Sequence, residues 1–142
     1  MKVRDIMTQK VIRIGQQEPA EVAARALTHY NIGILPVCGD DGRLCGVVTD
    51  RDLVTRCMAP GRLAGAVKVK DVMTPRVVSA GPDMDVTAAA SLMARAQVRR
   101  LPVVENGRLC GMVTLADLAS TENGCLDAAD ALAEISSNIL KK

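Results

Sequence analysis

Two short segments of the chain repeat the pattern Gly-x-x-Thr-x-x-Asp, first as GVVTDRD with Thr49 and Asp52, then as GMVTLAD with Thr114 and Asp117. An aspartate carboxylate accepts two hydrogen bonds at once, which suits the paired hydroxyls of a ribose, whereas a threonine hydroxyl beside helix amides suits a phosphate. The same spacing is typical of a helix capping box, with threonine as N-cap and aspartate three residues later. Both interpretations stay open. They are compatible, because a side chain that caps the helix in the empty protein can turn towards a ligand and bind it.

The elements that must position these residues also occur twice. VRDIMT, which starts at Val3, aligns with VKDVMT at Val69, 66 residues later, and the two LPV segments keep that offset. From Gly42 onward the offset is 65, because one residue is missing from a turn of the second copy. Each copy predicts a short strand, an amphipathic helix, two strands joined by an Asp-Gly or Asn-Gly turn, and a final helix. The sequence therefore predicts an α/β (α+β) fold with the order β-α-β-β-α, twice.

The local patterns predict details of each copy. We expect the short strands at residues 11–14 and 77–80, and a cap for the helix of the second copy at Asp83 or Asp85. The Asn-Gly dipeptide suits a two-residue type I′ turn, which fixes the pairing of the strands on either side. The pairs predicted for the second copy are Glu105–Arg108, Val104–Leu109 and Val103–Cys110, and those for the first copy are Cys38–Leu44 and Val37–Cys45.

The chain of 142 residues fits one globular unit of ordinary domain size, or two small halves that share a core. The repeats predict one domain at residues 1–58, a small-residue linker at 59–66 and a second domain at 67–121. Residues 122–142 have apolar side chains at near-helical spacing and predict a tail helix.

Composition argues against several functional classes. The chain has one tyrosine, no phenylalanine or tryptophan, and a net charge of +2, which is weak support for nucleic-acid binding. No apolar run resembles a signal peptide or a membrane span, and we expect a cytoplasmic protein without membrane contact. The five cysteines and one histidine show no metal-ligand spacing and no catalytic pairing. We therefore expect no metal site, no catalytic residue and no enzymatic activity.

The paired units V(R/K)D(I/V)MT…LPV…GRLCG(V/M)VT…DL resemble two CBS (cystathionine-β-synthase) domains, which together form a CBS pair or Bateman module. The resemblance covers residues 3 to about 121 and extends to small stand-alone bacterial two-CBS proteins. It implies tandem repeats with pseudo-twofold symmetry, followed here by a C-terminal helix. It also implies a central cleft for an adenosine-containing ligand such as AMP, ADP, ATP, S-adenosylmethionine or NAD.

The resemblance assigns roles by position. It implies ribose contacts from Asp52 and Asp117, and phosphate contacts from Thr49, Thr114, Arg99, Arg100 and Arg51. The adenine pocket that it implies is lined by Val11, Ile12, Ile34, Pro36, Val77, Val78 and Pro102. Because only the second copy has arginines before LPV, we expect that copy to favour a phosphorylated nucleotide. The alternative is that these arginines are ordinary surface charges or pair with Asp50.

Two functions follow from this comparison. The first is a non-catalytic regulatory module, with no required cofactor, that binds an adenosyl ligand and conveys energy or metabolic status to an unidentified regulated protein. The alternative is a ligand-free structural or stress-response module that acts by dimerisation and protein contact. In both cases we expect a homodimer.

Overall fold

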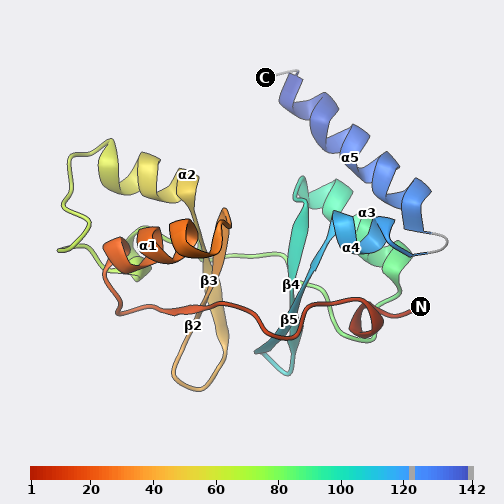
Figure 1. The fold of residues 1–142 in the computed structure, drawn as a ribbon, viewed down its shortest axis with the longest axis horizontal. Coiled ribbons are helices and arrows are strands. Elements are labelled where there is room, and N and C mark those ends of the chain that lie inside the picture. Colours follow the sequence, from red (N-terminus) through yellow and green to blue (C-terminus); the bar gives the residue numbers. More distant parts are fainter. Residues whose placement is uncertain (122–123, 141–142) are drawn as a thin grey trace. The chain divides into compact units, whose positions relative to one another are not determined.

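The computed structural model describes residues 1–121 and 124–140, although no side chains are described at 124, 125 or 138–140 (Figure 1). The predicted mixed α/β class, with two repeats and a C-terminal helix, is confirmed. The chain forms two compact units. We call Ile12–Val77 the first-repeat unit, and Met1–Val11 together with Val78–Lys142 the second-repeat unit.

The first-repeat unit has a three-stranded sheet in the order β1-β2-β3, with β1 parallel and β3 antiparallel to the central strand. Its elements are β1 (Ile14–Gly15), α1 (Ala20–Tyr30), β2 (Ile34–Cys38), β3 (Leu44–Thr49), α2 (Asp50–Asp52), the π-helix η2 (Leu53–Met58) and the 3-10 helix η3 (Val69–Asp71). The apolar face of α1 packs against the sheet through residues such as Ala23 and Leu27, which are buried with Leu35 and Val48.

The second-repeat unit has the antiparallel pair β4-β5 and a larger set of helices. Its elements are the 3-10 helix η1 (Val3–Asp5), α3 (Val86–Ala96), β4 (Arg100–Glu105), β5 (Arg108–Thr114), α4 (Leu115–Ala119) and α5 (Gly124–Leu140). The predicted tail helix is thus present from Gly124 to Leu140, and the remainder of 122–142 lies outside the described residues. Helix α5 runs along α3 and α4 (Figure 1) and buries Ala128, Ala131 and Ile135 in the core of the unit.

The leading segment of each sequence repeat belongs to the unit of the other repeat. In the second-repeat unit, Thr8 and Met112 exchange two backbone hydrogen bonds of 2.9 Å each. In the first-repeat unit, Thr74 and Val47 exchange two of 2.7 and 3.0 Å. The compact units are therefore displaced along the sequence from the repeats.

This displacement shortens the predicted first strands. Only Ile14 and Gly15 of the first copy pair with β2, and in the second copy Ala80 makes an isolated parallel bridge to Val103. The residues before Ile14 and Ala80 span the unit boundaries at Val11/Ile12 and Val77/Val78. A strand forms only where a neighbouring strand shares hydrogen bonds with it. Within the described part of the chain, the residues directly before Ile14 and directly before Ala80 form no ladder with another strand.

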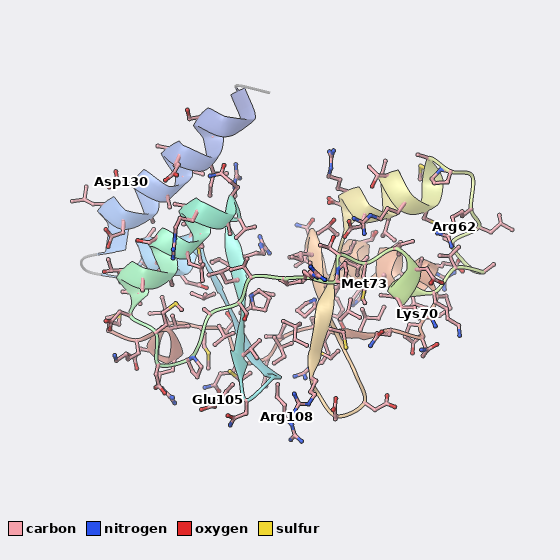
Figure 2. The ribbon with its side chains drawn as sticks, turned by 180° about the vertical axis from the view of Figure 1, so that it is seen from behind. Arg62, Lys70, Met73, Glu105, Arg108 and Asp130 are labelled. Carbon is pink, nitrogen blue, oxygen red and sulfur yellow. The ribbon has the colours of Figure 1, made fainter. Side chains whose placement is uncertain are left out.

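The hairpin register is right near each turn and wrong beyond a β-bulge. Glu105 pairs with Arg108 and Val104 with Leu109, and Figure 2 shows Glu105 and Arg108 at the tip of their hairpin. The predicted pairs of Val103 with Cys110 and of Val37 with Cys45 are wrong: Val103 pairs with Gly111, and Val37 with Gly46. Cys45 and Cys110 are each the extra residue of a β-bulge. Counting pairs outward from the turn assumes that every residue has one partner, and it therefore cannot predict such a residue.

The glycine after each bulge permits a close approach of the exchanged segment. A Cβ on Gly46 would overlap the carbonyl oxygen of Thr74 and lie 3.1 Å from the Cα of Pro75. A Cβ on Gly111 would lie 2.6 Å from the sulfur of Met7 and 3.0 Å from the carbonyl oxygen of Thr8. The repeated glycine is therefore needed because another backbone segment crosses β3 and β5 at these positions.

The predicted caps of α3 have a different role. Asp85 occupies the N-cap position but makes no side-chain capping hydrogen bond, and its carboxylate lies 3.2 Å from the ammonium of Lys2. Asp83 accepts hydrogen bonds of 2.6 and 2.9 Å from the guanidinium of Arg4. Both aspartates thus hold the N-terminal segment on the second-repeat unit.

Candidate functional site

The repeated threonine and aspartate form a helix capping box in each unit. In the first-repeat unit, the hydroxyl of Thr49 accepts from the amide of Asp52 at 3.0 Å, and the Asp52 carboxylate accepts from the amide of Thr49 at 3.0 Å. In the second-repeat unit, the corresponding distances between Thr114 and Asp117 are 3.1 and 2.9 Å. The capping interpretation is therefore confirmed, and it fixes both residues where a strand ends and a helix begins.

The first-repeat polar cluster consists of Thr49, Asp52, Arg56 and Thr74. Besides its cap, the Asp52 carboxylate accepts from the Thr74 hydroxyl, which lies 3.1 and 3.2 Å from its two oxygens. The Nε of Arg56 lies 3.9 Å from the same carboxylate, while its NH1 group donates to the carbonyl of Met73 at 2.7 Å. Asp52 is 7% exposed. Its carboxylate is thus satisfied within the unit.

The second-repeat polar cluster consists of Arg100, Thr114 and Asp117. Asp117 is only partly buried, and among the described residues the amide of Thr114 is the one donor recorded to its carboxylate. Thr8, which aligns with Thr74, is exposed, and no hydrogen bond from its hydroxyl to Asp117 is found in the described part of the chain. The Asp117 carboxylate therefore retains accepting capacity that Asp52 has lost.

The strand residue paired with the threonine is basic in the second-repeat unit and apolar in the first. Arg100 is the partner of Thr114 in the β4-β5 ladder, and directly opposed residues project their side chains to the same face of a sheet. At the equivalent place in the first-repeat unit, Ile34 is the partner of Thr49. The arrangement in the second-repeat unit combines a cationic group, a hydroxyl and a carboxylate.

The remaining arginines of the prediction are exposed. Arg99 precedes β4, and its carbonyl accepts from the amide of Leu115 at 2.9 Å at the start of α4. Arg51 lies in α2, where its amide donates to the Asp50 carboxylate at 2.8 Å. Neither guanidinium forms an ion pair with a described residue, and Arg100 forms none within the same part of the chain. Asp50 lies in the other unit from Arg99 and Arg100, and pairing with it stays a prediction.

The predicted apolar residues are divided between the two units. Ile12, Ile34, Pro36 and Val77 belong to the first-repeat unit, and Val11, Val78 and Pro102 to the second. Pro36 and Pro102 are buried strand residues, whereas Ile12 and Val78 are 37% and 42% exposed. Within its unit, Ile34 is brought beside Thr49, and Pro102 lies two residues from Arg100 on the same face of β4.

Thr74 is a member of a polar cluster that was not predicted from the sequence. The signal was present, because IMT at Thr8 and VMT at Thr74 repeat with the same offset as the strands. Nothing in the spacing, however, indicated that Thr74 would reach Asp52 while Thr8 would not reach Asp117.

Among the residues that the structure describes, three groups have shifted pKa values. The ion pair and hydrogen bond with Asp83 raise the pKa of Arg4 above its ordinary value. Burial raises the pKa of the Cys38 thiol and of the Cys110 thiol. Both cysteines are therefore held in the neutral form and are weak nucleophiles.

Known proteins match this chain over nearly its whole length. A family model described as "CBS domain" matches residues 3–59 and 69–123. The chain is 39% identical over 134 residues to the CBS domain-containing protein YhcV of Bacillus subtilis, covering 94% of each chain. It is 36% identical over 116 residues to Hypoxic response protein 1 of Mycobacterium tuberculosis, covering 82% of this chain and 81% of that protein.

Solved structures are similar over most of the chain. Hypoxic Response Protein I, solved with two coordinated zinc ions, matches with a TM-score of 0.77 and 35% identity over 84% of this chain and 97% of that chain. The CBS domain pair of protein MJ0100, solved in complex with 5-methylthioadenosine and S-adenosyl-L-methionine, matches with a TM-score of 0.72 and 28% identity. That match covers 84% of this chain and 93% of the other.

Proposed function

This chain belongs to the CBS domain family, and we propose that it is a regulatory CBS pair whose second-repeat polar cluster binds an adenosine-containing ligand. CBS-pair proteins are generally regulatory and non-catalytic. The observation that carries the proposal is the combination of Arg100 beside Thr114 with an Asp117 carboxylate that is capped on one side only.

Each residue of the cluster has a role that its chemistry supports. The Asp117 carboxylate accepts hydrogen bonds from the two hydroxyls of a ribose while it keeps its hydrogen bond from the Thr114 amide. The Thr114 hydroxyl and the Arg100 guanidinium bind a phosphate, and Arg99, next along the chain, adds positive charge. Charge-assisted hydrogen bonds of this kind contribute about 1.5 to 3 kcal/mol each when well made.

The ligand class is the adenosine group shared by AMP, ADP, ATP, NAD and S-adenosylmethionine. The MJ0100 pair supports this class, because its ligands are methylthioadenosine and S-adenosylmethionine. The first-repeat cluster contributes less in our proposal, because Asp52 is satisfied by Thr74 and Ile34 stands where Arg100 is found. In the second-repeat unit we assign apolar contacts with adenine to Val11, Val78 and Pro102, and in the first-repeat unit the corresponding role to Ile12, Ile34, Pro36 and Val77.

Hypoxic Response Protein I holds two zinc ions, and we do not propose a zinc site in this chain by analogy with it. In the described ranges, no three histidine, cysteine, aspartate or glutamate side chains lie together in a way that could hold a metal ion. Zinc sites require such a set, usually of four ligands.

The proposed signalling role is a change of shape passed to a regulated protein by a homodimer in the cytoplasm. A ligand shifts an equilibrium between two shapes only by its different affinity for each. Over the described residues, no helix is both long and apolar enough to cross a membrane.

A ligand-free structural module is the second candidate. The observation that favours it is that both Thr-Asp pairs already act as capping boxes, which explains their repetition without a ligand. In that case the protein acts through dimerisation and protein contact alone.

A ligand panel separates the two candidates. AMP, ADP, ATP, NAD and S-adenosylmethionine are each added to the full chain, and binding is followed by calorimetry and thermal unfolding. At 100 times its dissociation constant, a ligand stabilises the folded state by about 2.7 kcal/mol, which is a measurable shift in Tm. A panel without any binding would establish the structural module and refute the sensor.

Variants then test the assignment within the site. Arg100→Ala is expected to weaken phosphorylated ligands about tenfold or more and to leave S-adenosylmethionine unchanged, because only the former carry phosphate. Arg108→Ala, at the tip of the same hairpin, is the matched control. Asp117→Asn is expected to weaken every ligand, while its carbonyl oxygen still accepts from the Thr114 amide and preserves the cap. Unchanged affinities in both variants would contradict the assignment.

A further inference from the structure

Two exposed asparagines, Asn31 and Asn106, have a left-handed backbone conformation. Asn31 follows α1 with a φ of 52°, and Asn106 has a φ of 55° at the tip of the β4-β5 hairpin, between Glu105 and Arg108 (Figure 2). The side-chain carbonyl of an asparagine can react with the backbone amide of the next residue. The state of that next amide therefore decides which of these two side chains is reactive.

The amides that follow the two asparagines differ in their hydrogen bonds. The amide of Ile32 donates to the carbonyl of Leu27 at 3.0 Å, and its β-branched side chain stands beside it. Gly107 has no side chain, and its amide has no acceptor within the part of the chain that the structure describes. Because no native hydrogen bond has to break first, the amide of Gly107 is the one that is free to react.

The internal repeat places an equivalent turn, with an aspartate in place of the asparagine, in the first-repeat unit. At the offset of 65, Asp41 and Gly42 correspond to the Asn-Gly dipeptide of the second hairpin. The amide of Gly42 donates to the carbonyl of Gly39 at 3.0 Å, and the Asp41 carboxylate accepts from the amide of Arg43 at 3.1 Å. Both reacting groups are thus engaged in the first turn. Among the described residues, neither has a partner in the second.

We propose that Asn106 is a site of spontaneous deamidation in the folded protein, through a succinimide ring closed with Gly107. The amide nitrogen of Gly107 forms a bond to Cγ of Asn106, the bond between Cγ and Nδ2 breaks, and Nδ2 leaves as ammonia with the amide proton. Water then opens the ring at one of its two carbonyl carbons. Opening at Cγ leaves aspartate, and opening at the main-chain carbonyl carbon leaves isoaspartate, whose backbone runs through Cβ and Cγ.

Both products change the tip of the hairpin. Aspartate adds a negative charge next to Glu105, and isoaspartate lengthens the main chain by one atom. The pairing of Glu105 with Arg108 depends on a two-residue turn with φ of 55° and 81°. A longer main chain is incompatible with that turn, and we expect isoaspartate to break this pair while the far end of the hairpin keeps its register. The reaction requires no ligand.

Peptide mapping of the folded full chain tests the site. The protein is incubated in mildly alkaline buffer and digested with trypsin, which cleaves after lysine and arginine. Asn106 is then on fragment 101–108, Asn31 and Asp41 are together on fragment 26–43, and the other Asn-Gly dipeptide, at 123–124, is on fragment 109–141. Fragment 101–108 is expected to gain the mass difference between an amide and a carboxylic acid at least ten times faster than fragment 26–43. Chromatography should resolve its product into aspartate and isoaspartate forms.

Asn106→Gln is the matched variant, because the longer side chain would have to close a six-membered ring. It should abolish the change in fragment 101–108, and circular dichroism verifies that the variant is folded. The wild-type chain unfolded in urea is the second control, because there no folded turn restrains the Asn-Gly sequence. A fragment 101–108 that reacts in urea but not in the folded chain would overturn the proposal, because the turn would then protect Asn106. Equal rates for Asn31 and Asn106 in the folded chain would overturn it as well. Neither outcome involves a nucleotide, and both leave the proposed function untouched.

Discussion

The two repeated aspartates should differ in their contribution to stability, although the sequence presents them as equivalent. The perturbation is Asp52→Ala in one protein and Asp117→Ala in another. Each removes the acceptor of a capping box. Only the first also removes the acceptor of a hydroxyl from the exchanged segment, that of Thr74.

The magnitude follows from the number and burial of these bonds. Hydrogen bonds to a charged group contribute about 1.5 to 3 kcal/mol, and the low end applies to the 3.0 to 3.2 Å distances at Asp52. Two such bonds at a residue that is 7% exposed amount to about 3 kcal/mol. Loss of one partly exposed cap at Asp117 costs about 1 kcal/mol. The contact from the half-exposed Arg56 adds little.

Urea unfolding followed by circular dichroism measures the difference. With a urea dependence of about 1 to 3 kcal/mol per molar, a gap of about 2 kcal/mol separates the two midpoints by roughly 1 M. Thr74→Val is the matched control, because it keeps the side-chain shape and removes the hydroxyl. It should account for about half of the Asp52→Ala loss, and it should be nearly additive with Asp117→Ala.

Equal losses in the two aspartate variants would refute this reasoning. That result would mean that the Thr74 hydroxyl contributes nothing net, and that Asp52 is as available to a ligand as Asp117. The asymmetry used in the proposed function would then lose its structural basis.

Two further predictions concern residues outside the polar clusters. Gly46→Ala should destabilise the fold by about 1 to 3 kcal/mol because its Cβ would overlap the carbonyl of Thr74, whereas Gly81→Ala, with open space around it, should change urea stability by less than about 1 kcal/mol. Burial raises the pKa of the Cys38 and Cys110 thiols, so that above the ordinary thiol value of 9.0 the unfolded chain loses these protons first. Stability should therefore fall as pH rises from about 9, and a Cys38→Ala, Cys110→Ala protein, compared in unfolding at pH 8 and 10, should lose less; an equal loss would contradict this.

The repeat predicted the fold class, the order helix-strand-strand-helix in each copy and the positions of both capping boxes, whereas the first strand predicted for the second copy is only an isolated bridge at Ala80. Offsets of 66 and 65 identify equivalent residues without any structure, and the local patterns of turn and helix are strong. The register failed at one residue in each hairpin, at Cys45 and Cys110. Each bulge lies next to the glycine that Thr74 or Thr8 approaches, and a period-two count from the turn does not anticipate its extra residue.

The residues of the candidate site could be predicted from the sequence. Which of their oxygen atoms are free to accept a hydrogen bond from a ligand could not. Thr49 and Asp52 match Thr114 and Asp117 in type and spacing, and both pairs form the same cap. Their difference arises from Thr74, which is distant in sequence and reaches only one of them. Exposure and hydrogen-bond capacity are properties of the packed unit, and a pattern of residue types cannot contain them.

The unit of repetition in the sequence is not the unit of packing. The segment at Val69 completes the first-repeat unit, where its amide donates to the carbonyl of Glu18 at 2.8 Å, and the segment at Val3 completes the second, where its amide donates to Met84 at 2.8 Å. Both valines are fully buried. If the chain were cut between the repeats, each half would lose the valine that is buried in its core. Each half would also expose to solvent the glycine, Gly46 or Gly111, that the exchanged backbone segment covers. The repeated valine and glycine therefore serve the exchange of segments, while the repeated threonine and aspartate form the capping boxes, of which our proposal assigns the second to a ligand.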